Sequence, residues 1–133
     1  DQRHLDAASL SEMLRQAQEA SERFAAEENI DVRWEKIWSI EPILFDETLI
    51  DLCDDACREV AGVSHRLPSG PLHDAAEIAR AGVPTVMLFV QTLRVLSHPK
   101  LEHPSEEQLE LSVAALDRLA DKTIAWVSDS AAG

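Results

Sequence analysis

Residues 84–90 read PTVMLFV, and this stretch decides the fold class that the sequence predicts. Every residue after Pro84 and Thr85 is apolar, and the polar Gln91 closes the run. A short, uninterrupted apolar run bounded in this way is typical of a central strand that other elements cover on both faces. We therefore expect a buried strand here.

Two helices and a short strand are expected upstream of this run. Residues 73–81 (HDAAEIARA) predict a helix that ends at Gly82, and residues 46–60 predict a longer one that ends at Gly62. Residues 65–67 (HRL) predict a short strand between the two helices. The apolar stripe expected on the longer helix consists of Leu49, Leu52, Cys53, Ala56 and Val60.

The N-terminal part predicts a helix followed by a strand. Residues 5–27 have helical apolar spacing, with a capping box of Ser9 and Glu12, or Asp6 as a rival cap. Residues 29–40 begin with the alternating stretch IDVRWE, which predicts a half-buried strand. The stripe expected on the helix consists of Leu10, Met13, Leu14, Ala17, Ser21 and Phe24.

The C-terminal part predicts a loop and a long helix. The loop covers residues 92–104, and Ser105 with Gln108 caps a helix that runs to about Val127. Residues 128–133 are expected to fray. The stripe expected on this helix consists of Leu109, Val113, Leu116, Ala120, Thr123 and Val127.

Helices and strands thus alternate along the chain, which favours an α/β fold with mainly parallel strand pairing. The chain has 133 residues, of which 45% are hydrophobic, so we expect one compact domain or pieces of two. It begins on polar residues at Asp1 without an initiator methionine, and we expect it to be the tail of a longer protein.

Composition also narrows the partners and the compartment. A net charge of −13 and a pI near 4.6 argue against binding to nucleic acid or to an anionic membrane. No apolar run approaches the roughly 18 residues of a membrane helix. Cys53 and Cys57 lie on one helical face, and we interpret them as small buried residues in a reducing, cytoplasmic compartment.

Two clusters could carry chemistry. Residues 70–75 (GPLHDA) form a turn into a helix, where backbone N–H groups favour an anion or a developing oxyanion. The alternative is that Asp74 only complements the helix dipole. Residues 97–103 (SHPKLEH) follow the expected buried strand, where α/β proteins place their sites, and His98 could bind a metal or could be a surface histidine.

The order and separation of the two clusters resemble the C-terminal third of the hydantoinase/carbamoylase amidases. These include N-carbamoyl-L-amino acid hydrolase, β-ureidopropionase and allantoate amidohydrolase, in the zinc aminoacylase and carboxypeptidase superfamily. The matching segments are DQR at 1–3, FD at 45–46, LPSGPLHDA at 67–75, MLFV at 87–90 and LSHPKLE at 96–102. The pair of SG..HDA and SH...E in this order is the specific part of the resemblance.

The resemblance implies a role for each matching residue. His98 matches a metal-ligand histidine, and Arg3 matches an arginine that holds the carboxylate of the substrate, which suits a planar guanidinium. Gly70, His73 and Asp74 match a turn that lines the substrate pocket. No catalytic residue is implied in this chain, because the general-base glutamate of the family belongs to an N-terminal part.

The resemblance also implies an architecture and an activity. Residues 1–41 would be the end of an α+β lid and dimerisation domain, and residues 42–133 would be the C-terminal part of a metal-dependent amidohydrolase domain. The implied reaction is hydrolysis of a small amide or ureido substrate with a divalent metal, zinc first and manganese, cobalt or nickel as alternatives. We expect a homodimer in the complete protein and no hydrolysis by the 133-residue chain alone.

The sequence departs from the family pattern at several positions. Leu72 replaces the second glycine of the GAGH turn, where an added side chain intrudes on any close backbone approach to substrate. Arg94 and Val95 replace the two glycines of the GGISH segment, and Lys100 stands where proline is usual. Because of these changes, two alternative hypotheses stay open. The chain could be a degenerate relative used for binding or dimerisation, or an unrelated α/β interaction domain.

Overall fold

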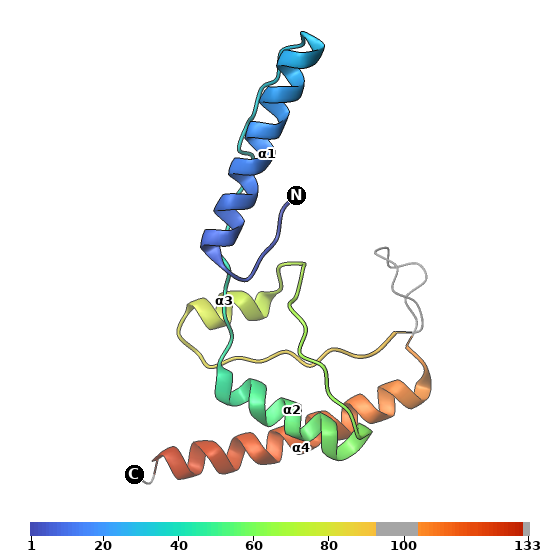
Figure 1. Ribbon diagram of the computed structural model, residues 1–133. Coiled ribbons are helices and arrows are strands. Elements are labelled where there is room, and N and C mark those ends of the chain that lie inside the picture. Colours follow the sequence, from blue (N-terminus) through green and yellow to red (C-terminus); the bar gives the residue numbers. More distant parts are fainter. Residues whose placement is uncertain (93–103, 132–133) are drawn as a thin grey trace. The chain divides into compact units, whose positions relative to one another are not determined.

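The computed structural model describes residues 1–92 and 104–131, in which four helices form. They are α1 (Ala7–Glu28), α2 (Glu47–Ala61), α3 (Asp74–Arg80) and α4 (Glu106–Ala131) (Figure 1). The chain divides into two compact units, Asp1–Leu44 and Phe45–Gly133, and each is described by itself.

Helix α1 makes up most of the first unit, and its cap differs from the first expectation. The Asp6 carboxylate accepts a hydrogen bond from the Ser9 backbone N–H at 2.7 Å, so the helix begins at Ala7. The expected capping box of Ser9 and Glu12 is wrong, because Ser9 already lies inside the helix and the Glu12 carboxylate binds Arg15 instead. The rival cap, Asp6, is confirmed.

A left-handed residue turns the chain at the end of α1. Asn29 has φ 53° and ψ 47°, and the next amide, that of Ile30, donates to the Ala25 carbonyl at 2.9 Å. The following residues run back along the helix (Figure 1), and the Trp34 indole N–H donates to the Ser21 hydroxyl at 2.7 Å. This unit buries Ala25 and leaves Trp38 68% exposed.

Helix α2 follows its expected boundaries closely, because both of its end signals are local. The Asp46 carboxylate caps the Leu49 N–H at 2.9 Å, and Gly62 takes φ 74° just past the last turn. The expected stripe is confirmed at Leu49, Cys53 and Ala56, which are buried. Asp54, a charged residue on the flank of this stripe, is buried as well.

Helices α2 and α4 pack together to form the core of the second unit (Figure 1). Cys53 and Ala56 from α2 meet Leu119 from α4, and Ala56 has no exposed surface. The small side chain of Ala56 lets the two helices approach closely. Across the helix pair, the Lys122 ammonium donates to the Glu59 carboxylate at 2.8 Å.

The buried face of α4 is not the predicted one. Ala115 and Leu119 are buried, whereas Leu109, Val113 and Leu116 from the expected stripe are 46–67% exposed. Helix α4 carries apolar residues on more than one face, and α2 packs against the face that holds Leu119. Ser105 caps the helix as expected, but the helix continues to Ala131, so most of the expected frayed end is helical.

The segments 29–40, 65–67 and 84–90 were expected to be strands, but the described residues contain no strand. A strand needs a ladder of backbone hydrogen bonds to a partner, and the single bond from the Asp46 N–H to the Thr85 carbonyl, at 3.1 Å, does not make a ladder. Along the last segment, Val86 and Leu88 pack against the α2–α4 core while Phe89 is 47% exposed. The expected α/β layout, with a strand covered on both faces, is therefore not confirmed.

Candidate functional site

The segment before α3 brings three of the predicted site residues into one turn. Gly70, His73 and Asp74 lie within five consecutive positions, and the Ser69 hydroxyl donates to the Pro71 carbonyl at 2.9 Å across the bend. The His73 carbonyl then accepts from the Ala76 N–H at 2.9 Å, which starts the helix. The turn is short, and its prolines restrict its backbone.

His73 stands at the N-cap position of α3 but does not cap the helix with its side chain. Its half-buried imidazole lies edge-on to the ring of Phe89, with the ring centroids 6.3 Å apart and the planes at 62°. Such an edge contact holds an aromatic ring without using its polar atoms. Among the described residues, no cap hydrogen bond engages the imidazole nitrogens, so they can bind a ligand.

Asp74 is the first helical residue of α3, and it is exposed. Together with Glu77 it places negative charge in the first turn, which stabilises the helix dipole. The position of Asp74 therefore agrees with the alternative hypothesis, in which this residue only complements the helix dipole. Its carboxylate is one residue beyond the imidazole of His73 along the turn.

Leu72, which stands in place of a family glycine, is half exposed between Gly70 and His73. Its side chain is therefore not absorbed into the α2–α4 core. The left-handed glycines of this unit are Gly62 and Gly82, both at helix ends.

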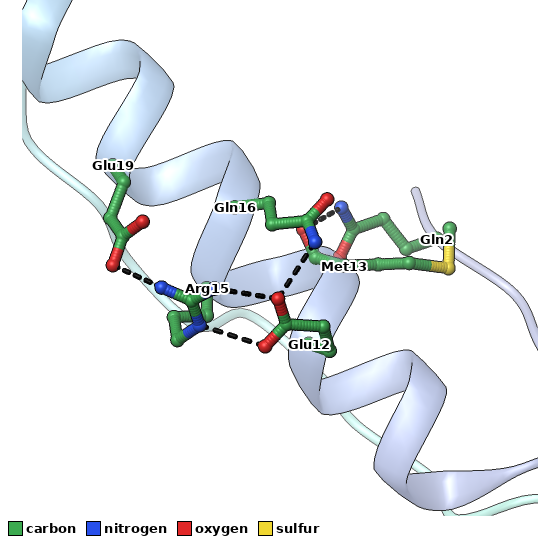
Figure 2. A network of polar contacts seen from close by, with 6 residues as sticks. All are labelled: Gln2, Glu12, Met13, Arg15, Gln16 and Glu19. Carbon is green, nitrogen blue, oxygen red and sulfur yellow. Dashed lines mark hydrogen bonds and ion pairs between the residues drawn. The ribbon is translucent and has the colours of Figure 1, made fainter.

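Arg3 lies in the first unit, on the segment before α1. Its guanidinium pairs with the Asp1 carboxylate at 2.5 Å, and both side chains are more than half exposed. The neighbouring Gln2 amide donates to the Met13 carbonyl at 3.1 Å, which holds this segment against the helix (Figure 2). The arginine is thus presented to solvent by an anchored segment.

Beside that anchor, Arg15 lies between two carboxylates on the surface of α1 (Figure 2). It donates to both oxygens of Glu12, at 2.6 and 2.8 Å, and it also pairs with Glu19. Hydrogen bonds from Arg15 and then Gln16 lower the pKa of Glu12 to about 2. Arg15 thus forms its ion pairs with Glu12 and Glu19 of its own helix.

His98, the predicted metal ligand, lies outside the described residues, as do Arg94 and Val95. Within residues 1–92 and 104–131, no group of three or more His, Cys, Asp or Glu side chains is placed to hold a metal ion. A catalytic zinc usually takes about three protein ligands. The described residues by themselves therefore do not fit a catalytic metal centre.

An apolar groove of about 510 Å³ lies in the second unit, lined by residues of α2, α3, α4 and the 84–86 segment. Among the described residues that line it, two threonines, Thr85 and Thr123, carry polar side chains and none is titratable. None of the helices in the described ranges is long and apolar enough to cross a membrane.

Two contacts of the turn could not be found from the sequence pattern. In the sequence, Phe89 is one member of an apolar run, and Arg66 is one residue of the short expected strand 65–67. Phe89 reaches His73 over 16 positions of the sequence, and Arg66 reaches Asp54 over 12. No local periodicity signals such pairs.

Comparison with known proteins gives a family and two curated relatives. The pattern of Peptidase family M20/M25/M40 matches residues 6–122. An N-carbamoyl-L-amino acid amidohydrolase of Geobacillus stearothermophilus is 27% identical over 96 residues, which are 72% of this chain and 23% of that protein. An allantoate amidohydrolase of Bacillus subtilis (strain 168) is 37% identical over 83 residues, 62% of this chain and 20% of that protein.

No solved structure gives a significant match. The chain spans less than a quarter of the length of either curated relative. The resemblance inferred from the two sequence clusters is confirmed by the family match and by both relatives.

Proposed function

The chain belongs to Peptidase family M20/M25/M40, and from this premise we propose that it is part of an amidohydrolase. The bond cleaved would be a C–N bond of an N-carbamoyl or ureido amino acid, or of allantoate. Both curated relatives carry amidohydrolase names, which supports this class of reaction. The proposal concerns the complete protein.

The observation that carries the proposal is the turn from Gly70 to Asp74. The motif resemblance implies that this turn lines the substrate pocket, and the imidazole of His73 contacts the ring of Phe89 instead of capping α3. A histidine held in this way can donate or accept a hydrogen bond at a substrate carbonyl or carboxylate. Arg3 would hold the carboxylate of the amino acid through a bidentate pair.

We also propose that the reaction depends on a divalent metal, zinc first, with manganese, cobalt and nickel as alternatives. His98 would be the one ligand that this chain supplies, and other parts of the protein would supply the rest. Such an ion provides Lewis acidity for amide hydrolysis. On this basis the 133-residue chain alone is inactive, because one ligand does not make a catalytic site.

Homodimerisation through the first unit is proposed as well. The extended segment after α1 leaves large apolar side chains in solvent, with Ile37 94% exposed and Trp38 68% exposed. Exposed apolar surface of this kind favours association. A monodisperse monomer of the chain in sedimentation velocity would contradict the proposal.

The function is tested in the complete protein with a panel of N-carbamoyl amino acids, ureido acids and allantoate, with ammonia release as the readout. His73→Ala should lower kcat/KM by about 10- to 100-fold, which corresponds to one hydrogen bond to a charged group. His65→Ala is the matched control, because His65 is an exposed histidine of the same unit. His98→Ala should reduce both the bound metal and the activity.

The replacement of a family glycine by Leu72 is the observation that favours the second candidate, a non-catalytic relative. Leu72→Gly separates the two candidates. If the complete wild-type protein hydrolyses a substrate of the panel, the hypothesis that it is an enzyme is supported. If neither the wild type nor Leu72→Gly releases ammonia from any of them, the binding or dimerisation reading replaces it.

A further inference from the structure

We propose that Arg66 is a positioning residue that ties the turn carrying Gly70 and His73 to helix α2. The effect on substrate binding rests on the proposed function, whereas the anchoring of the turn does not. Arg66 lies four residues before Gly70, in the extended connection between α2 and α3.

The anchor consists of two carboxylates on α2. The Arg66 guanidinium donates through Nη2 to Asp51 Oδ1 at 2.6 Å and to Asp54 Oδ2 at 3.3 Å. Asp51 and Asp54 are three positions apart on the helix, so both lie on the side along which the connection runs. A single side chain therefore bridges one turn of α2.

The anchor depends on the burial of the Asp54 carboxylate. Its side chain is 7% exposed although it is a carboxylate, and a buried charge is tolerated only when it is paired and hydrogen-bonded. Arg58 supplies one partner from within α2, at 2.8 Å, and Ser64 and Arg66 supply the others from the connection. Because Ser64 and Arg66 both interact with the Asp54 carboxylate, residues 64–66 lie against the helix.

The link from Arg66 to the turn is stiff. Pro68 has its φ angle locked by its ring, and Leu67, which precedes a proline, is restricted to extended conformations. Four residues span at most about 14 Å even when they are fully extended. Beyond them the Ser69 hydroxyl closes the bend on the Pro71 carbonyl. A fixed Arg66 therefore restricts where Gly70 can lie.

The far side of the same turn is held separately. His73 is the N-cap residue of α3 and contacts Phe89. Arg66 thus fixes the entry to the turn, and α3 with Phe89 fixes its exit. Loss of Arg66 should loosen the entry without unfolding α3.

Arg58 offers a matched control. Its guanidinium also pairs with the buried Asp54 carboxylate, but it belongs to α2, and among the described residues this side chain makes no ion pair to the connection. Both arginines are more than half exposed, so neither contributes much to global stability. Arg66→Gln and Arg58→Gln each remove one pair to Asp54, and the first alone frees the connection.

The first measurement is backbone ¹⁵N relaxation of the chain and three variants, Arg66→Gln, Arg58→Gln and Arg66→Lys. In Arg66→Gln, the order parameters of Leu67, Ser69, Gly70 and Leu72 should fall from about 0.85 toward 0.6. In Arg58→Gln they should stay at the wild-type values, and Arg66→Lys should recover part of the order. Equal order parameters in both glutamine variants would overturn the proposal.

The second measurement is kinetic, in the complete protein. A displaced turn weakens ground-state binding of the substrate, so Arg66→Gln should raise KM by about 10-fold, which corresponds to the loss of about one hydrogen bond to a charged group. A purely structural defect would instead lower the active fraction, and with it the apparent kcat, at constant KM. A variant with a loosened turn and an unchanged KM would overturn the positioning role. A wild type without any turnover would refute the proposed function alone, since the relaxation data judge the anchor.

Discussion

The ring of Phe89 meets the imidazole of His73 edge-on, with 6.3 Å between the ring centroids and 62° between the planes. The two residues come from separate segments of the sequence, an apolar run and a turn before a helix. Their contact joins the predicted substrate turn to the segment whose Val86 and Leu88 pack on the α2–α4 core. The imidazole therefore contacts a segment that packs on the core of this unit.

We predict an energetic coupling between His73 and Phe89. A double-mutant cycle with His73→Ala and Phe89→Ala should give about 0.5–1 kcal/mol, the lower part of the range for aromatic pairs, because Phe89 is half exposed. The readout is urea unfolding of the two single variants and the double variant. The pair His65 and Phe89 serves as the control, since no ring contact joins them among the described residues. Additive effects of His73→Ala and Phe89→Ala would show that the contact contributes nothing.

Leu119→Ala should destabilise the second unit. Leu119 is 7% exposed and meets Cys53 and Ala56, so its truncation removes apolar contacts and leaves a void between α2 and α4. We expect a loss of about 2 kcal/mol in the free energy of unfolding, near the lower end for buried leucines because a groove adjoins the site. Val113→Ala, at a position 67% exposed on the same helix, should change the free energy little.

Some features of the second unit could be predicted from the sequence, and others could not. The starts of α2 and α4 and the end of α2 were predictable, because Asp46 and Ser105 cap amides only three residues away and Gly62 ends its helix by its own conformation. The buried face of α4 was not, because several of its faces are apolar and only the position of α2 selects one. Strand formation likewise depends on a partner elsewhere, which periodicity does not encode.

The candidate site divides in the same way. Gly70, His73 and Asp74 are neighbours in sequence and were predictable as one turn. The partners that hold this turn, Phe89 and Arg66, depend on how distant segments pack. The predictions on His98 concern residues outside those that the structure describes, and they stay predictions.

Acid should weaken α1 through Glu12. Hydrogen bonds from Arg15 and then Gln16 lower the pKa of Glu12 from its ordinary 4.5 to about 2. Because the folded-state pKa lies below the unfolded value, the stabilisation is complete above pH 4.5 and is lost as the pH falls toward 2. Glu12→Gln should therefore lose less helicity over this window, measured by far-UV circular dichroism. Glu22→Gln is the control, because Glu22 makes no ion pair in the described part of the chain.

The two cysteines should differ in reactivity. Burial first, and then the neighbouring Cys57, raise the pKa of the Cys53 thiol to about 11, and Cys53 is also the more buried of the two. Since the thiolate is the nucleophile, iodoacetamide should modify Cys57 well before Cys53 in the folded chain. Peptide mass spectrometry over a time course measures the order. In urea both should react at similar rates, and faster labelling of Cys53 in the folded chain would contradict its place in the α2–α4 core.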